Sequence, residues 1–271
     1  MYNTITTIQN EVIEILKGKG YEAEATETIR NGVTLKGVVV RSNGLNPVAW
    51  IDEKYTAERI AEGLIVGLSK DFNYKEVGDF ESIKKDLRTY LTRAENAGIV
   101  TEDFIGEIKI GARVNLEKFE DGASASIKVT SALLQIWGKS FSEVLEVAKA
   151  NTAEVAVYKP MFEMIKSMIP VEDFDDMLNR PDPMSVLTTQ DGQNGASLIA
   201  NKEILDRIHD TKGDYYIIPS SIHEVIIVPC SFASADMLRP MISEVNDSVV
   251  SPEEVLSNDL FKYDGKVVSV A

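Results

Sequence analysis

DYYIIPSSIHEVIIVP, residues 214–229, is the stretch that decides the fold. Two apolar, β-branched runs flank a Pro-Ser-Ser turn, which is typical of a buried β-hairpin. The connection between the two runs carries four polar side chains, Ser220, Ser221, His223 and Glu224. Because binding residues concentrate on loops that a rigid scaffold positions, this turn is the first place to look for a site.

Outward from the hairpin, short β-like runs alternate with helical segments. Strands are expected at 21–30, 33–41, 48–51, 105–116, 123–129, 184–189, 196–199 and as a pair within 260–270. Helices are expected at 5–17, after Thr56, at 131–137, 140–151, 160–169, 201–209, 235–245 and 251–256, whereas 79–96 suits either element. Ser140 and Glu143 have the spacing of a capping box. The strands come mostly as hairpin-like pairs, which predicts an α+β fold with mixed or mostly antiparallel sheets packed with helices.

At 271 residues the chain is long enough to bury one large core or two small ones. We expect a single α+β unit over 1–271. A subdivision into 1–170 and 184–271 is the alternative, around the acidic, proline-containing loop 171–183.

The net charge of −15 restricts the partners of the chain. Excess carboxylates repel phosphate backbones and anionic membranes, so neither direct nucleic-acid binding nor membrane docking is expected. Solubility explains such a charge, and mimicry of a nucleic acid that blocks a basic partner is the sharper alternative. The single cysteine permits no intrachain disulfide, and the N-terminus lacks a secretory pattern. No apolar run approaches the ~20 residues that span a bilayer. We therefore expect a cytoplasmic protein.

Ser221 and His223 are the only candidates for covalent chemistry. Two residues apart on a strand, they share a face, whereas Glu224 points the other way and cannot orient this histidine. The chain has no Gly-x-Ser-x-Gly elbow. Serines that satisfy turn backbone groups, beside a half-buried strand histidine, are the simpler interpretation. A ligand-contacting turn, or a hydrolase or transferase assisted by a carboxylate from elsewhere, stays open.

Metal and cofactor chemistry find little support in the sequence. Two histidines and one cysteine show no ligand spacing, and no phosphate-loop motif occurs. The acidic run 172–176 lacks the bent loop and closing glutamate of an EF-hand. His209 is expected to favour the negative end of a helix dipole. We predict no metal and no cofactor.

Methionines gather in one region of the chain. Met161, Met164 and Met168 share the face of an expected helix. Core packing explains this spacing, and an adaptable binding surface is the alternative.

Three segments carry a family resemblance. They are YYIIPSSIHEVIIVP at 215–229, EVNDSVVSPEEVLSNDLFKYD at 244–264 and LQIWGKSFSEVLEVAKANT at 134–152. Together they resemble a domain-of-unknown-function family of Clostridia-type Firmicutes that is distantly similar to the YtpQ-like proteins. The resemblance implies an intracellular bacterial protein, encoded on a phage or mobile element, and it supplies no catalytic residues.

These observations favour a non-enzymatic, cytoplasmic binding or regulatory protein that acts through a protein surface on a protein partner. A Ser221/His223-dependent hydrolase or transferase using the 219–224 turn is the first alternative, and an acidic nucleic-acid mimic is the second. The binding candidates are Ser220, Ser221, His223, Glu224, Met161, Met164 and Met168.

Overall fold

A computed structural model describes residues 2–42, 46–69, 77–93, 98–118, 124–166, 183–219, 221–248 and 250–271. The chain forms two compact units, Met1–Ser82 and Ile83–Ala271. The acidic loop proposed as a boundary, 171–183, lies almost wholly outside the described residues. The strands on either side of it, β8 (Ala156–Pro160) and β9 (Ser185–Thr189), pair with each other.

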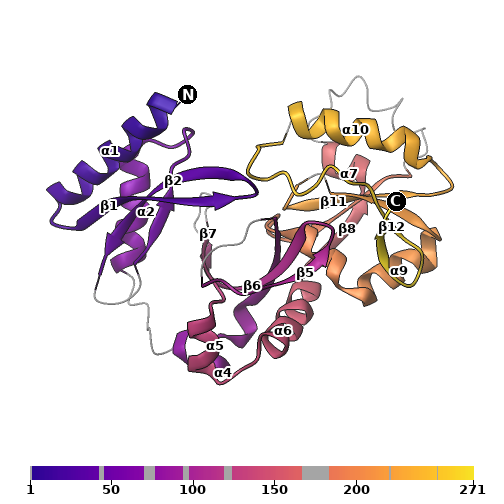
Figure 1. The fold of residues 1–271 in the computed structure, drawn as a ribbon, viewed down its shortest axis with the longest axis horizontal. Coiled ribbons are helices and arrows are strands. Elements are labelled where there is room, and N and C mark those ends of the chain that lie inside the picture. Colours follow the sequence, from indigo (N-terminus) through magenta and orange to yellow (C-terminus); the bar gives the residue numbers. More distant parts are fainter. Residues whose placement is uncertain are drawn as a thin grey trace. The chain divides into compact units, whose positions relative to one another are not determined.

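The first unit is a small sheet covered by two helices. Its elements are α1 (Tyr2–Gly18), β1 (Glu22–Arg30), β2 (Val33–Arg41), β3 (Val48–Trp50) and α2 (Ala57–Ser69). The strands lie in the order β1-β2-β3 and both pairs are antiparallel (Figure 1). Leu16 of α1, Leu64 of α2 and Val38 of β2 meet in one core, as the helical and alternating patterns predict.

The second unit contains two further sheets. Its first half holds α4 (Phe80–Ile83, which starts in the first unit), η1 (Lys84–Asp86), β4 (Leu87–Thr92), β5 (Thr101–Ile105), β6 (Ile108–Lys118), β7 (Ser124–Lys128), α5 (Ser131–Trp137) and α6 (Phe141–Glu154). β6 pairs with β4 on one side and with β5 and β7 on the other, and we call these four strands the central sheet. The Ser140–Glu143 capping box forms as predicted.

The C-terminal half builds a larger sheet. It holds β8, α7 (Met161–Ile165), β9, η4 (Gly195–Ala200), α9 (Lys202–Lys212), β10 (Tyr215–Ile218), β11 (Glu224–Pro229), α10 (Ala235–Ser248), β12 (Phe261–Tyr263) and β13 (Val268–Val270). The strand order is β13-β12-β10-β11-β9-β8, which we call the large sheet. Every strand pair of the described residues is antiparallel, so the predicted α+β class is confirmed.

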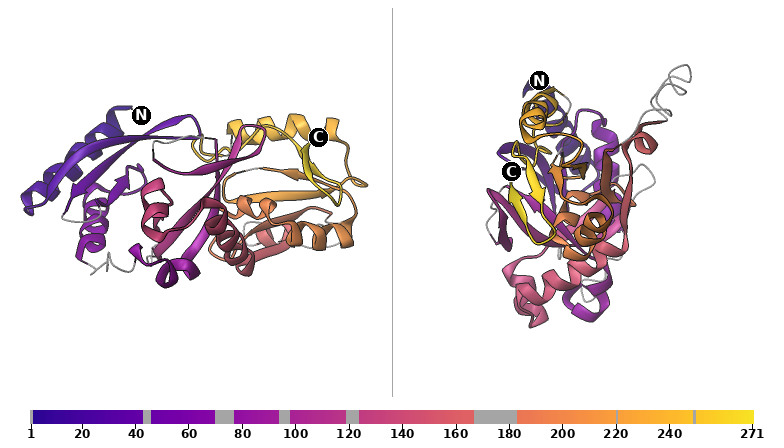
Figure 2. Two further views of the ribbon diagram at one scale, coloured as in Figure 1. Left: turned by 60° about the horizontal axis from the view of Figure 1, so that its bottom comes forward. Right: turned by 90° about the vertical axis from the view of Figure 1, so that its right-hand side faces the viewer.

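The predicted hairpin lies at the centre of the large sheet. Tyr215 and Ile217 face one side, which η4 and α9 cover, whereas Tyr216 and Ile218 face α10. Figure 2 shows α10 and α9 on opposite faces of this sheet. A strand buried on both faces is continuously apolar, which explains why this run lacks polar alternation.

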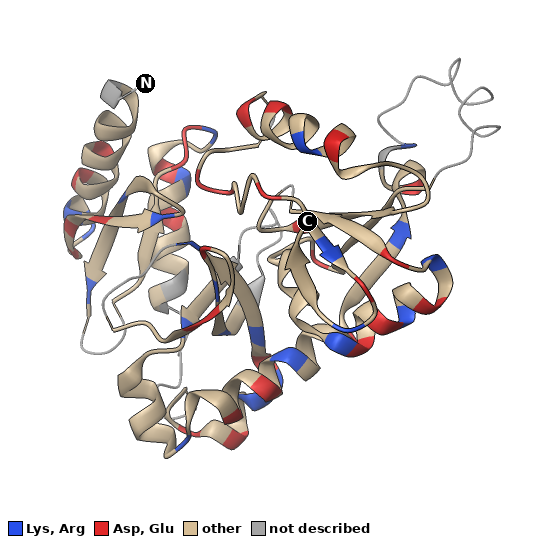
Figure 3. Ribbon diagram, turned by 45° about the vertical axis from the view of Figure 1, so that its right-hand side comes forward, with Lys and Arg blue, Asp and Glu red and all other residues tan. Residues whose placement is uncertain are grey.

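Charged residues are dispersed over the ribbon. Figure 3 shows Asp and Glu distributed along helices and loops, with Lys and Arg interspersed among them. On α9, for example, Lys202 and Asp206 form an ion pair one turn apart.

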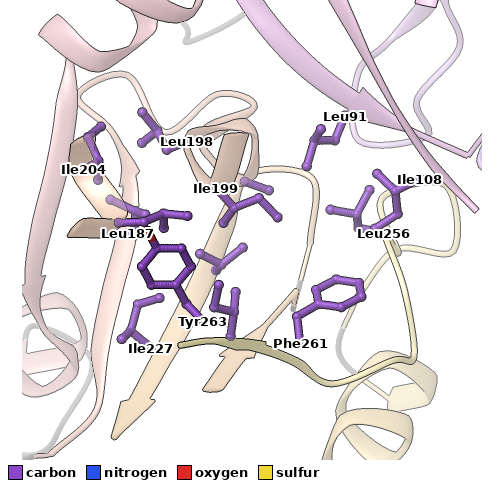
Figure 4. Close-up of a cluster of buried hydrophobic side chains, with 14 of the residues drawn as sticks. Leu91, Ile108, Leu187, Leu198, Ile199, Ile204, Ile227, Leu256, Phe261 and Tyr263 are labelled. Atoms are coloured by element: carbon purple, nitrogen blue, oxygen red, sulfur yellow. The ribbon is translucent and has the colours of Figure 1, made fainter. Parts of the chain in front are cut away.

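The central and large sheets share one core. Leu91 and Ile108 of the central sheet pack with Leu187, Ile227 and Tyr263 of the large one (Figure 4). Burial of such side chains is worth about 1.5–3 kcal/mol each, which fixes the two sheets into one unit.

Three expected elements differ from the structure. Residues 196–199 form the 3-10 helix η4 rather than a strand, because a short apolar run buried on all sides has the same composition in either element. Residues 251–256 form hydrogen-bonded turns, since the Glu254 carbonyl accepts a hydrogen bond from Ile222 N–H instead of continuing a helix. The helix expected at 160–169 is α7, and 167–169 lie outside the described residues.

Candidate functional site

The turn between β10 and β11 holds Ser221 in a closed set of hydrogen bonds. The buried Ser221 hydroxyl donates to Oε1 of Glu224 at 2.8 Å and accepts from the N–H of His223 at 2.9 Å. Ser220 lies outside the described residues. The hydroxyl therefore stabilises the turn, as the simpler interpretation predicts, and is directed at a carboxylate rather than at an imidazole.

His223 is held at both ring nitrogens. Nδ1 accepts from the backbone N–H of Asn194 at 3.3 Å, and Nε2 lies 3.3 Å from Oε1 of Glu254. An Nδ1 that accepts requires the proton of a neutral imidazole to be on Nε2, where it is directed at the Glu254 carboxylate. A general base needs a nitrogen that faces the hydroxyl it activates. In this structure both ring nitrogens contact other groups, and the Ser221 hydroxyl contacts Glu224 rather than the imidazole ring.

Glu254 is a residue that sequence reasoning missed. It lies 31 positions from His223, in a segment for which a helix was expected. Glu224 does not orient His223, as predicted, but it contacts Ser221 rather than pointing away from it, because β11 begins only at Glu224 and Ser221 lies in the turn before the strand. Only tertiary structure brings the 251–256 turns to the hairpin, through the Ile222 N–H to Glu254 carbonyl bond of 3.0 Å.

Asn194 connects this turn to the central sheet. It has a left-handed backbone (φ 56°), which asparagine tolerates better than most residues. With the side-chain amide oriented so that its oxygen faces the guanidinium, Oδ1 accepts from both Nη atoms of Arg113 at 2.9 and 3.1 Å. The Asn194 carbonyl accepts from the Ser197 hydroxyl at 2.8 Å. Glu254, His223, Asn194 and Arg113 thus form one chain of contacts across four segments.

A second set of polar side chains, Thr89, Thr152 and Ser197, connects η4 and α6 to the edge of β4 that pairs with no other strand of the described residues. The Thr152 hydroxyl accepts from the N–H of Thr89 at 2.9 Å and donates to the Ala148 carbonyl at 2.7 Å. Ser197 Oγ lies 3.2 Å from the Thr89 carbonyl and accepts from the Thr89 hydroxyl at 2.8 Å. An edge strand exposes unpaired backbone groups, and the Thr152 hydroxyl provides the acceptor for one of them, the N–H of Thr89, without a further strand.

His209 lies in the last turn of α9, as expected, and has a carboxylate partner that the sequence did not indicate. α9 continues to Lys212, and His209 Nε2 lies 3.1 Å from Oδ1 of Asp214. Lys262 pairs with the other carboxylate oxygen at 2.7 Å. The Lys262 hydrogen bond, followed by that of His209, lowers the pKa of Asp214 below its ordinary value. The expected placement at the negative end of the helix dipole therefore stands, and in addition the Asp214 carboxylate beyond the helix end holds this histidine.

The methionine helix is only partly described. Met161 is half-buried and Met164 is exposed, whereas Met168 lies outside the described residues. A more extended apolar row occurs on α10, where Met237, Met241 and Val245 are 64%, 52% and 40% exposed. We call these three residues the α10 stripe. Their i, i+4 spacing is visible in the sequence, but their exposure depends on which face the sheet covers.

No group of three or more His, Cys, Asp or Glu side chains within the described ranges has the arrangement of a metal site. The acidic run 172–176 falls outside those ranges. Burial raises the pKa of the Cys230 thiol above its ordinary value, so this thiol stays protonated. No helix in the described part of the chain combines the length and apolarity that crossing a membrane requires.

The fold is that of an α+β protein. Polar contacts around the β10–β11 turn connect its central sheet to its large sheet. Residues 2–265 match the model of a family of unknown function, DUF5688, and the chain belongs to that family. Neither the curated proteins nor the solved structures contain a significant match.

Proposed function

We propose that this chain is a non-enzymatic binding or regulatory protein that acts through the exposed side of α10. The α10 stripe is the observation that carries the proposal. Each of its residues precedes a buried residue of α10, namely Leu238 and Ile242, which pack on the large sheet, and Asn246, which donates to the Ser257 carbonyl. The apolar face of α10 is therefore wider than the surface that the sheet covers, and the uncovered part runs along the helix.

The partner is a protein segment with an apolar face flanked by basic residues. Methionine side chains are flexible and polarizable, so they adapt to apolar surfaces of different shape. Three exposed carboxylates, Asp236, Glu244 and Asp247, lie along the same helix, and the chain as a whole carries a charge of −15. Complementary charge favours encounter with a basic segment and disfavours an acidic one. An amphipathic helix that lays its apolar face on the stripe fits both features.

The contacts of the hairpin turn support binding over catalysis. A hydrolase or transferase would need Ser221 to leave Glu224 and His223 to leave either Asn194 or Glu254. Nucleic-acid mimicry requires clustered carboxylates. The carboxylates in Figure 3 are dispersed, so they support mimicry less than they support binding through the α10 stripe.

We further propose a bacterial cytoplasmic location and a distant relationship to the YtpQ-like proteins of Clostridia-type Firmicutes, with an origin on a phage or mobile element. The three segments at 134–152, 215–229 and 244–264 support the relationship. One cysteine in 271 residues agrees with a reducing compartment, where disulfides are rare.

A synthetic amphipathic peptide tests the surface. A fluorescent helix of about 14 leucine and lysine residues is titrated with the protein and followed by anisotropy. We expect Met237→Lys/Met241→Lys to weaken binding about tenfold or more. Ile136→Lys is the matched control, because Ile136 is 63% exposed on another helix, α5. Rising salt concentration should weaken the interaction with the wild type.

Three outcomes contradict the proposal. The first is equal affinity of the wild type and the double variant for the peptide, and the second is equal affinity of the wild type for a scrambled peptide of the same composition. The third is a homodimer in light scattering that the double variant dissociates, because the stripe would then serve self-association. A photo-crosslinker at Met241, with one at Ile136 as control, extends the test to cells.

A further inference from the structure

One face of the central sheet gathers cations, although the chain as a whole is strongly acidic. Arg88 of β4 is the register partner of Arg113 of β6, and Arg113 is the register partner of Lys128 of β7. Register partners share a face, so three cationic side chains form a row across three strands. We call Arg88, Arg113 and Lys128 the cationic row.

Tyr90 lies beside this row on the same face. Its register partner is Gly111, two residues before Arg113. The Tyr90 hydroxyl oxygen lies 2.5 Å from the position that a Cβ of residue 111 would take, so the ring crosses β6 where only glycine leaves room. Lys128 Nζ lies 4.8 Å from the centroid of the same ring. The phenol therefore reaches from β4 toward the side of β6 that carries Lys128.

The Tyr90 hydroxyl is the unusual group here. Tyr90 is only 3% exposed, and its hydroxyl has no hydrogen-bond partner among the described residues. A buried hydroxyl without a partner is costly, so it calls for a physical reason, of which a bound ion or ligand is one. Burial raises the pKa of Tyr90 well above its ordinary value, against the opposing charge of Arg113. The phenol stays protonated and can donate.

We propose that this face of the central sheet binds a phosphate group, with the Tyr90 hydroxyl, Arg113 and Lys128 as its donors. A phenol, a guanidinium and an ammonium all donate to oxyanions, and a phosphate has enough acceptor oxygens for all three. Arg88 and Lys128 are half-buried, so the row reaches the surface at both ends while its centre is buried. The ligand we infer is a small phosphate or phosphate monoester, because the acidic chain repels a long polyanion.

Inorganic phosphate is the probe for this site. Thermal unfolding and calorimetric titration of the whole chain are compared in sodium phosphate and in sodium chloride of equal ionic strength. We expect phosphate to raise the unfolding temperature by about 2 °C or more over chloride, because a ligand of the folded state stabilises it. Phenyl phosphate should act similarly and acetate only weakly.

Tyr90→Phe is the decisive variant, because it keeps the ring on Gly111 and removes only the hydroxyl. It should be at least as stable as the wild type in chloride and should weaken phosphate binding about tenfold. Lys128→Gln should weaken phosphate binding as well. Lys109→Gln is the matched control, because Lys109 lies on the same face but pairs with Asp103 at 2.5 Å.

Three results would overturn the site. They are equal unfolding temperatures of the wild type in phosphate and chloride, full phosphate binding by Tyr90→Phe, and tighter binding of a short oligonucleotide than of phenyl phosphate. None of these variants touches the α10 stripe, so this proposal and the proposed function succeed or fail separately.

Discussion

His223 Nε2 and Glu254 Oε1 lie 3.3 Å apart, although 31 residues separate them along the chain. This contact joins the start of β11 to the turns after α10. The opposite ring nitrogen accepts from Asn194, so one imidazole connects three segments that are distant in sequence. In this fold the histidine of the β10–β11 hairpin therefore holds other parts of the chain to the hairpin.

Removing the carboxylate should weaken the connection without unfolding the chain. Glu254→Ala is expected to cost about 0.5–1.5 kcal/mol, because the hydrogen bond is lost but the partly exposed histidine can bind water. Glu254→Gln keeps an acceptor oxygen and should cost less. Urea unfolding measures both, and a cycle with His223→Ala should show positive coupling between the two residues. Strict additivity would mean that the contact contributes nothing.

Gly195 allows η4 to approach the hairpin closely. A Cβ at this position would lie 2.5 Å from the His223 carbonyl oxygen and 2.6 Å from Thr188 Cα. Backbone atoms cannot yield as a flexible side chain can, so Gly195→Ala should destabilise the chain by about 1–3 kcal/mol. Gly18→Ala is the control, since nothing lies within 4 Å of its Cβ position. Similar unfolding midpoints for both variants would refute the close approach.

Thr152 should be sensitive to the loss of its hydroxyl alone. Thr152→Val preserves shape but leaves the buried N–H of Thr89 without its acceptor, at a cost of about 1–3 kcal/mol. Thr152→Ser keeps the oxygen and should retain most of the stability. Chemical denaturation compares the two, and amide exchange at Thr89 should accelerate only in the valine variant. Unchanged exchange there would contradict the assigned acceptor.

Acid should remove the contribution of Asp214. In the folded state the pKa of Asp214 lies below its ordinary value of 3.8, first because of the hydrogen bond from Lys262. The ionised carboxylate therefore stabilises the fold at pH values above 3.8. This contribution is lost as the pH falls from that value through the lower folded pKa. Asp214→Asn should therefore be less stable than the wild type near neutral pH, with the difference shrinking below about pH 4. A constant difference across that range would exclude this linkage.

Local patterns predict much of this fold. The hairpin of β10 and β11, the capping box of α6 and the terminal pair β12–β13 follow from turn residues, alternation and capping, which act within a few positions. The predictions that fail concern segments whose secondary structure depends on tertiary contacts. Residues 196–199 became a 3-10 helix because η4 packs between β4, β9 and β11, which no local pattern reveals.

The polar contacts of the turn were only half predictable. Sequence spacing correctly predicted that Glu224 does not orient the imidazole, but it wrongly placed Ser221 on the same strand face as His223, because β11 begins only at Glu224 and the Ser221 hydroxyl contacts that carboxylate instead. Glu254, Asn194 and Arg113 come from other elements, and only sheet topology brings them together. The cationic row was equally hidden, since strand register aligns its members.

The core of the second unit draws on residues from Leu91 to Tyr263, whereas the core of the first is complete within its own 82 residues. During synthesis on the ribosome, the first unit can pack as soon as it has emerged. The second must wait for β12 before its large sheet gains the strand that borders β10. Nascent chains should therefore acquire protease resistance in two stages, the later one only after Tyr263 has left the exit tunnel.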